Sequence, residues 1–117
     1  MRIVIAGCGY VGSELGRELA REGHTVFGVR RDPAGLPAGI EGVAADLGSL
    51  SSLRESFPEG ADALVYCAAP SERGEQAYER TYVAGLTNVL EILHARGEHV
   101  GRVLFTSSTA VYAQDDG

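Results

Sequence analysis

Three glycines near the amino terminus, Gly7, Gly9 and Gly12, have the spacing G-x-G-x-x-G. The apolar run Ile3–Ala6 before them predicts a buried strand, and apolar residues four apart after them indicate a helix. Such a turn lets a phosphate group approach the backbone, and the unpaired N–H groups of the helix N-terminus attract its charge. A tight turn without a ligand would need only one glycine. The sequence therefore predicts that a dinucleotide pyrophosphate binds at Gly7, Gly9, Tyr10, Val11 and Gly12.

The next candidate site is the pair Arg30 and Arg31, which follows a second apolar run, Thr25–Val29. An acidic residue about 20 positions beyond the glycine turn usually binds the ribose hydroxyls of NAD. Two guanidinium groups can instead bind a 2′-phosphate, so we expect NADP rather than NAD. The alternative is that both arginines are solvated loop residues. Asp32 stands beside Pro33, and we expect it to lie in a turn and to point elsewhere.

Further candidates follow the later apolar runs, because ligands of parallel sheets lie beyond the carboxyl ends of the strands. A carboxylate after the third run could accept a hydrogen bond from an adenine amino group, or could belong to an ordinary turn. Small residues after the fourth run would let the backbone run close to a cofactor. A hydroxyl after the fifth run could polarise a carbonyl or relay a proton, or could only satisfy loose backbone groups. These residues are Asp46 and Leu47, then Cys67, Ala68 and Ala69, then Ser108.

Short apolar runs alternate with helical patterns along the whole chain, which predicts right-handed βαβ units and a parallel sheet. The expected fold is a doubly wound α/β domain over residues 1–117, with about five strands in the order 3-2-1-4-5, ending before a sixth strand. Ser49 is expected to cap a helix, and Gly23 and Gly97 to follow helix ends. The expected strands are Arg2–Ala6, Thr25–Val29, Glu41–Ala45, Ala63–Cys67 and Arg102–Thr106, and the expected helices are Val11–Glu22, Leu50–Ser56 and Glu75–Arg96.

Composition narrows the possible partners. The chain has 117 residues and a formal net charge of -6, which makes nucleic acid an unlikely partner. No apolar run approaches the roughly 20 residues that span a bilayer, and no secretory signal is found at the start, so we expect a cytoplasmic protein without a membrane partner. Cys8 and Cys67 match no metal-binding spacing, so we expect no metal site and two small buried side chains.

Four segments together resemble the N-terminal part of the extended and atypical short-chain dehydrogenase/reductases, the NAD-dependent epimerase/dehydratase family. They occur in the family's order and span nearly the whole chain. The segments are Gly7-Cys-Gly-Tyr-Val-Gly12, Ala45-Asp-Leu47, Val83-Ala-Gly-Leu-Thr-Asn-Val-Leu-Glu91 and Ser107-Ser-Thr-Ala-Val-Tyr112.

The resemblance implies roles for single positions. Ser108 stands where the family carries its catalytic Ser or Thr, four residues before Tyr112, which matches a Val-Tyr-Gly turn and is not the catalytic tyrosine. Arg30 replaces an Asp that is common in the family. Tyr82 stands where many members have Asn, and Ala113 replaces a Gly. These differences suggest an atypical branch.

The family's catalytic Tyr-x-x-x-Lys pair has no counterpart, because all ten basic residues are arginine and the chain contains no lysine. The resemblance therefore implies part of a longer fold, and two readings remain. The first is the cofactor-binding part of an NAD(P)-dependent oxidoreductase or epimerase that acts by hydride transfer on a nucleotide-sugar-like or small carbonyl substrate. The second is a non-catalytic NAD(P)-binding module with a regulatory or redox-sensing role.

The long helix expected at Glu75–Arg96 allows two interpretations. Family dimers commonly use helices in this position, so a homodimer surface is possible. Packing against the sheet explains the apolar residues of this helix more simply. These residues are Val83, Leu86, Leu90 and Leu93.

Overall fold

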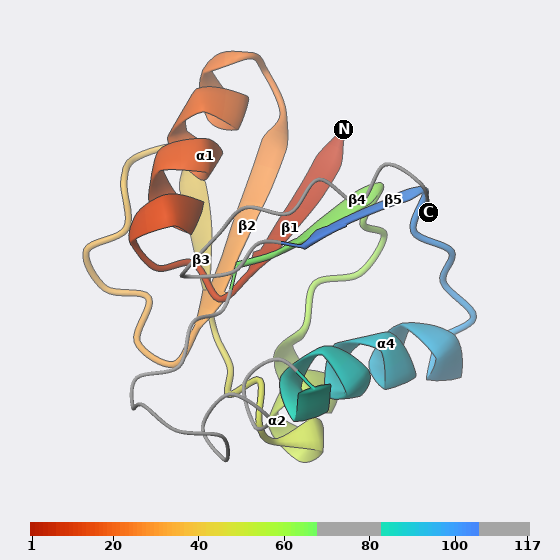
Figure 1. Ribbon diagram of the computed structural model, residues 1–117. Coiled ribbons are helices and arrows are strands. Elements are labelled where there is room, and N and C mark those ends of the chain that lie inside the picture. The colour runs from red at the N-terminus through yellow and green to blue at the C-terminus, as the bar shows by residue number, and fades with distance from the viewer. Residues whose placement is uncertain (68–82, 106–117) are drawn as a thin grey trace.

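The computed structural model describes residues 1–67 and 83–105, whose strands form a parallel five-stranded sheet in the order β3-β2-β1-β4-β5 (Figure 1). This is the fold class that the sequence predicts. The strands are β1 (Arg2–Ala6), β2 (Thr25–Arg30), β3 (Ile40–Ala44), β4 (Ala63–Tyr66) and β5 (Arg102–Phe105), and the helices are α1 (Tyr10–Arg21), α2 (Leu50–Ser56) and α4 (Gly85–Ala95).

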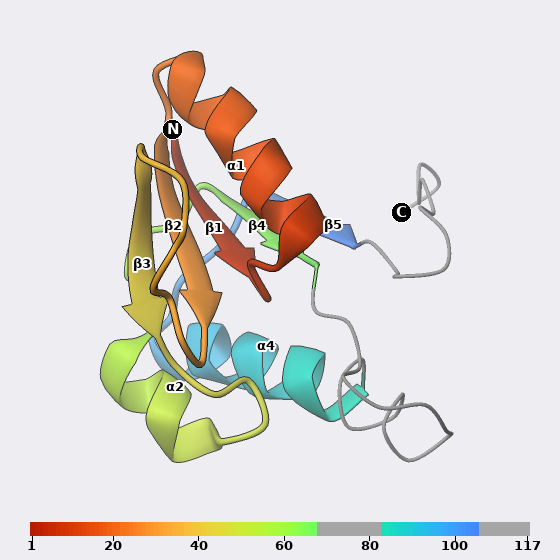
Figure 2. The same ribbon diagram turned by 90° about the vertical axis from the view of Figure 1, so that its left-hand side faces the viewer.

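Helices cover both faces of the sheet, as Figure 2 shows: α1 lies on one face, and α2 and α4 lie together on the other. Successive strand residues point to opposite faces. In β1, Val4 and Ala6 therefore join the core under α2 and α4, and Ile3 and Ile5 join the core under α1. The near-continuous apolar runs seen in the sequence reflect burial on both faces.

Helix ends follow the local rules that the sequence indicates. The Ser49 hydroxyl accepts a 3.3 Å hydrogen bond from the backbone N–H of Ser52 and so caps α2. Gly23 follows α1 with a φ of +94°, and Gly97 follows α4 with a φ of +68°. Both are in the left-handed region that glycine adopts without steric cost.

Most element boundaries are confirmed to within one residue, and the differences lie at strand ends near the candidate site. Strand β2 includes Arg30, one residue further than expected, while β3 ends at Ala44 and β4 ends before Cys67. The regular helix α4 begins at Gly85, and the first part of the helix expected from Glu75 lies outside the described residues, as does Thr106.

The apolar residues of the helix expected at Glu75–Arg96 do not all pack on the sheet, which corrects the sequence expectation. Leu93 is buried and Leu86 is half-buried, but Val83 is 55% exposed and Leu90 is 44% exposed. The buried positions of this helix are instead Gly85, Val89, Ile92 and Leu93.

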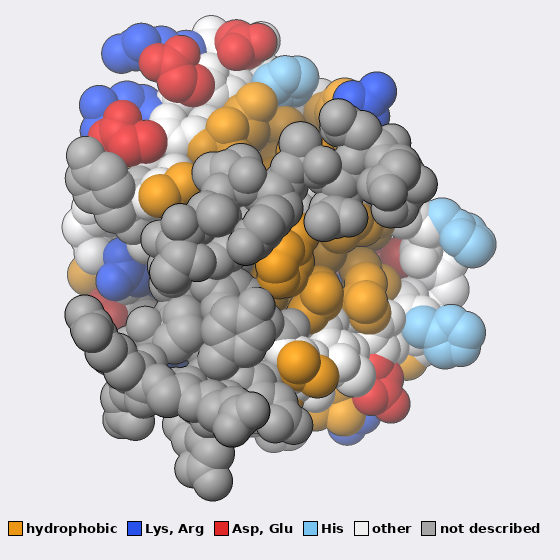
Figure 3. Space-filling model, in the orientation of Figure 1, with side chains coloured by type: hydrophobic (Ala, Val, Ile, Leu, Met, Phe, Trp, Pro, Cys, Tyr) orange, Lys and Arg blue, Asp and Glu red, His pale blue; other side chains and the backbone are white. Residues whose placement is uncertain are grey.

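Strand β5 also leaves apolar side chains uncovered. Val103 is 48% exposed and Leu104 is 56% exposed. Figure 3 shows hydrophobic side chains gathered on the side of the molecule where β4, β5 and α4 lie, next to atoms that the structure does not describe. Among the described residues, no helix is long and apolar enough to cross a membrane.

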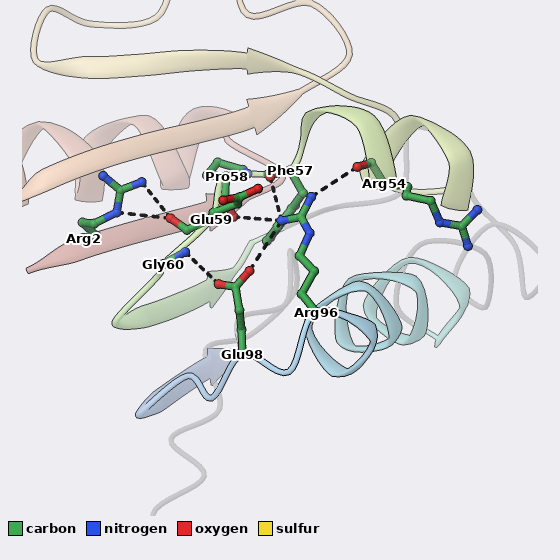
Figure 4. Close-up of polar contacts among 8 residues, drawn as sticks. All are labelled: Arg2, Arg54, Phe57, Pro58, Glu59, Gly60, Arg96 and Glu98. Carbon is green, nitrogen blue, oxygen red and sulfur yellow. Dashed lines mark hydrogen bonds and ion pairs between the residues drawn. The ribbon is translucent and has the colours of Figure 1, made fainter.

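Charged side chains join the elements at the amino edge of the sheet, where the strands begin (Figure 4). Arg96, which follows α4, donates to the backbone carbonyls of Arg54, Phe57 and Pro58 at 3.2, 2.9 and 3.5 Å. These carbonyls belong to the last turn of α2 and the residues just after it, where helical carbonyls lack partners within the helix. Glu98 lies 3.6 Å from Arg96 and accepts a 2.7 Å hydrogen bond from the Gly60 N–H.

Candidate functional site

The glycine turn between β1 and α1 is fixed by backbone hydrogen bonds to β2. The N–H groups of Gly7 and Cys8 both donate to the carbonyl of Val29, at 2.8 and 3.1 Å. Gly7 has a φ of +82°, a conformation that favours glycine. The Gly9 N–H donates to the Gly7 carbonyl at 2.8 Å. The chain therefore leaves β1 in a tight turn that presents the start of α1 at the carboxyl edge of the sheet.

The other two motif glycines have different surroundings. A Cβ atom at Gly12 would lie 3.0 Å from Cγ2 of Ile5 and 3.4 Å from the carbonyl oxygen of Gly7, so glycine allows the helix to pack closely on β1. A Cβ atom at Gly9 would meet none of the described residues within 4 Å, its two chain neighbours aside. The space beside Gly9 is therefore open, as a ligand phosphate would require.

The start of α1 can receive an anion at this open space. The first N–H groups of a helix have no intrahelical acceptor, and they give the N-terminus a partial positive charge. Gly9 is the N-cap and contributes no side-chain hydrogen bond, and the first turn holds no acidic residue. Tyr10 and Val11 begin this turn, as the sequence predicts, and the Val11 side chain is 56% exposed.

Cys8 fills a gap in the core beneath the glycine turn. A Cβ atom at Gly28 in β2 would lie only 2.9 Å from the Cys8 Sγ, so the thiol occupies the space that Gly28 leaves empty. Burial raises the pKa of the Cys8 thiol, although the Ser13 hydroxyl, 3.9 Å from the Sγ, opposes the shift. A buried neutral thiol is a packing group rather than a nucleophile. Cys8 is thus the small buried residue that the sequence predicts.

The two arginines at the end of β2 are placed differently. Arg30 is half-buried, and its Nη1 donates to the Cys8 carbonyl at 3.4 Å, which brings the guanidinium to the glycine turn. Arg31 is exposed and has no hydrogen bond or ion pair within the described ranges 1–67 and 83–105. The Asp32 carboxylate accepts a 3.1 Å hydrogen bond from the Ala34 N–H, so it lies in a turn as expected. The structure thus brings Arg30 to the candidate site, and most donors of both guanidinium groups have no partner among the described residues.

Asp46 lies in a turn after β3. Its Oδ1 accepts a 2.9 Å hydrogen bond from the Gly48 N–H, and its own N–H donates to the Ser52 hydroxyl at 3.0 Å. The carboxylate is exposed, and no hydrogen bond to its Oδ2 is found among the described residues. This geometry fits an ordinary turn and also leaves one carboxylate oxygen for a ligand.

Leu47 connects this turn to α4. Its side chain packs against the core, and its carbonyl accepts a 2.9 Å hydrogen bond from the Nδ2 of Asn88. Neither Asn88 nor Ser52 is among the site residues that the sequence predicts. A polar amide beside Val89, on the buried side of an apolar helix, is the one signal that could have indicated Asn88.

The remaining predicted site residues lie at the end of β4 and beyond. The Cys67 N–H donates to the Ala6 carbonyl at 2.8 Å, so this half-buried residue continues the pairing of β4 with β1 beside the glycine turn. Ala68, Ala69 and Ser108 lie outside the described residues. Among the residues that the structure does describe, no cluster of His, Cys, Asp or Glu could hold a metal ion.

Known proteins resemble this chain in sequence and in fold. The chain is 30% identical to the UDP-glucose 4-epimerase of Streptomyces lividans over 128 aligned residues, which cover 97% of the chain and 37% of that enzyme. A crystal structure of UDP-galactose 4-epimerase matches all of the chain and 41% of its own length, with 30% identity and a TM-score of 0.74.

A third likeness concerns the fold alone. The Bordetella bronchiseptica enzyme WbmG, solved in complex with NAD, is 24% identical, with a TM-score of 0.69 over 90% of the chain and 36% of its own length. The chain thus spans about two fifths of these relatives.

The model of the family described as NAD dependent epimerase/dehydratase matches residues 3–117, which is nearly the whole chain. The sheet order, the glycine turn and the relatives agree with this match. The match to a family described as NAD dependent also supports a nicotinamide dinucleotide as the cofactor. The chain therefore belongs to the NAD dependent epimerase/dehydratase family.

Proposed function

We propose that these 117 residues bind the nicotinamide dinucleotide of an epimerase/dehydratase-type oxidoreductase, with its pyrophosphate at Gly7, Gly9, Tyr10, Val11 and Gly12. The observation that carries the proposal is the open space beside Gly9 at the uncapped start of α1. Backbone N–H groups bind the pyrophosphate there, and the helix dipole favours its charge. When bound, the cofactor supplies hydride transfer.

We further propose that the cofactor is NADP rather than NAD. Arg30 reaches the glycine turn, and Arg31 beside it has no protein partner among the described residues. A 2′-phosphate would gain charge-assisted hydrogen bonds from both guanidinium groups. At the adenine end, Oδ2 of Asp46 accepts from the amino group, and Leu47 lies beside it. Cys67, Ala68 and Ala69 border the cofactor at the end of β4.

Two glycine-to-alanine variants, one of them a control, test the pyrophosphate site. In Gly9→Ala the added methyl group occupies the open space, so we expect NAD, NADP and ADP-ribose all to bind at least about tenfold more weakly by calorimetry. Gly101→Ala is the matched control, because its methyl group would lie 3.5 Å from the Asp62 carbonyl oxygen at the opposite edge of the sheet. Unfolding midpoints of both variants show whether the fold is kept. Unchanged affinity in a folded Gly9→Ala protein would overturn the proposal.

For a longer protein that contains this chain, we propose hydride transfer on a nucleotide-sugar-like or other small carbonyl substrate, with Ser108 polarising the reacting oxygen. Support comes from the relatives, which include a UDP-glucose 4-epimerase and a UDP-galactose 4-epimerase. The test is turnover of UDP-sugars and small carbonyls by that longer protein. Loss of turnover in Ser108→Ala, with cofactor affinity kept, is the expected result.

A non-catalytic NAD(P)-binding module is the second candidate, and the absence of lysine favours it for this chain alone. The family's acid/base tyrosine works with a lysine, so we expect the 117-residue chain to bind cofactor without turnover. Turnover that purifies with this chain and is lost in Ser108→Ala would exclude the module. The cytoplasmic location, the homodimer and the lack of nucleic-acid and membrane partners stay predictions of the sequence.

A further inference from the structure

The turn after β3 is held from two helices. From α2, the Ser52 hydroxyl accepts the Asp46 N–H at 3.0 Å. Within the turn, the Ser49 N–H donates to the Asp46 carbonyl at 2.9 Å, and the Gly48 N–H donates to the Asp46 Oδ1 at 2.9 Å. From α4, the Asn88 side chain donates to the Leu47 carbonyl at 2.9 Å. The turn that carries Asp46, whose Oδ2 has no hydrogen bond among the described residues, is therefore held on both sides.

The hydrogen bond from Asn88 differs from the others because it joins residues that are far apart in the sequence. The remaining bonds join residues at most six positions apart, so they form with α2 itself. Asn88 is 41 positions from Leu47 and is half-buried on a helix that packs against α2. Its amide is a side-chain hydrogen bond that ties the turn to α4, while the Ala45 N–H just before the turn donates to the Arg30 carbonyl of β2 at 3.1 Å.

We infer that Asn88 is a positioning residue for the adenine end of the cofactor: it holds the Leu47 carbonyl and thereby aims the Asp46 carboxylate at the base. The inference rests on the proposed dinucleotide site. The Asp46 side chain is exposed and its Oδ1 is held by the Gly48 N–H within the turn, so the direction of the carboxylate follows the position of the turn. A hydrogen bond to a charged group depends on geometry, and a tilt of the turn weakens it.

The experiment compares two dinucleotides that differ at one exocyclic group: NAD and nicotinamide hypoxanthine dinucleotide, in which a carbonyl replaces the adenine amino group. The unaltered chain is expected to bind NAD about tenfold more tightly, because the Asp46 carboxylate accepts from the amino group and repels the carbonyl. In Asn88→Ala the ratio of the two dissociation constants is expected to fall close to one. Thr87→Ala, an exposed neighbour on the same helix, is expected to keep the full ratio.

The ratio of the two dissociation constants separates positioning from a merely structural role, because a general loss of stability lowers the affinity for both ligands equally. Asn88→Ser is the second variant if Asn88→Ala fails to fold. Its small side chain suits a half-buried helix position, and its hydroxyl falls short of the Leu47 carbonyl. A folded Asn88 variant that keeps the full ratio overturns the inference. Equal binding of the two dinucleotides by the unaltered chain also overturns the inference. If the unaltered chain binds neither dinucleotide, the proposed function itself is contradicted.

Discussion

The arginines at the two edges of the sheet are used in opposite ways. At the amino edge, Arg96 donates to three backbone carbonyls, and Arg2 donates twice to the Glu59 carbonyl, at 2.7 and 3.2 Å (Figure 4). At the carboxyl edge, Arg30 makes one contact of 3.4 Å, and Arg31 makes none within the described part of the chain. The same side chain thus satisfies the backbone at one edge and keeps its donors available at the other.

The difference separates stabilisation from binding. A guanidinium has five N–H donors, and backbone carbonyls at a helix end need partners. Where these groups meet, as at Arg96, the arginine joins α4 to the end of α2 and has little capacity left for a ligand. Where a half-buried guanidinium lies beside an open helix N-terminus and makes one backbone contact, as at Arg30, its remaining donors and its charge favour an anion. Substitutions at the amino edge should therefore change folding, and those at the carboxyl edge should change affinity.

The largest effect is expected from Arg96→Ala. The variant loses three carbonyl contacts and leaves Glu98 without its cation, so the free energy of unfolding should fall by about 2–4 kcal/mol in a urea titration. Arg54→Ala is the control, because the Arg54 side chain is exposed and points away from the cluster in Figure 4. It should change stability by less than about 0.5 kcal/mol. Equal losses in the two variants would show that the amino-edge cluster contributes little.

The next effect concerns affinity rather than folding. Arg30→Asp replaces a donor to the 2′-phosphate with an acceptor for the ribose hydroxyls, so the preference for NADP should change to a preference for NAD. A hydrogen bond to a charged group contributes about 1.5–3 kcal/mol. The variant should therefore bind NADP at least about tenfold more weakly than the unaltered chain does. Calorimetric titration of both cofactors measures the ratio.

Arg102→Asp makes the same charge change at the opposite edge, on an exposed side chain. It should leave the ratio of NADP to NAD affinity unchanged. Equal affinities of the unaltered chain for both cofactors, or an equal effect of the two variants, would mean that Arg30 and Arg31 are solvated residues without a binding role.

The features of the carboxyl edge that could be predicted are those with a local sequence pattern. The apolar runs identify the central strands β1, β2 and β4 because these are buried on both faces, whereas β3 and β5 are edge strands whose residues are mostly exposed. Gly7, Gly9 and Gly12 identify the turn because their spacing lies within one βα unit. The sheet order then follows from the handedness of βαβ units. The carboxyl edge was therefore largely visible in the sequence.

The contacts that distinguish the edges were not visible, because they join residues far apart. Arg96 meets the end of α2 across 38–42 positions, and Asn88 meets Leu47 across 41 positions. Nothing in its local sequence separates Arg96 from a solvated side chain, and Asn88 differs from one only by its place beside the buried Val89 on an apolar helix. The exposure of Val83 and Leu90 was missed for a related reason: helical spacing identifies an apolar stripe, but packing decides which side of it meets the sheet.

A smaller effect on stability is expected from Arg2→Ala. The variant loses both bonds to the Glu59 carbonyl and the contact with Phe27, whose ring centre lies 4.8 Å from the guanidinium carbon. The loss should be about 1–2 kcal/mol, because these groups are partly exposed to water. Arg102→Ala, in the exposed first residue of β5, is the control for removing a charge at this edge. A loss as large as that of Arg96→Ala would contradict the ranking of the two clusters.

The smallest effect is expected for the ion pairs on the outer face of α1. Arg17 and Glu14 lie 3.0 Å apart with side chains 46% and 52% exposed, so water screens their attraction. A double-mutant cycle should give a coupling of about 0.2–0.5 kcal/mol that decreases as salt is added. Arg96 and Glu98 are 3.6 Å apart, but their side chains are only 21% and 19% exposed. Their cycle should give at least about twice that coupling and depend less on salt, because burial reduces screening. Equal couplings would mean that distance outweighs burial, and that the amino edge is held by Arg96's bonds to the carbonyls rather than by its ion pair.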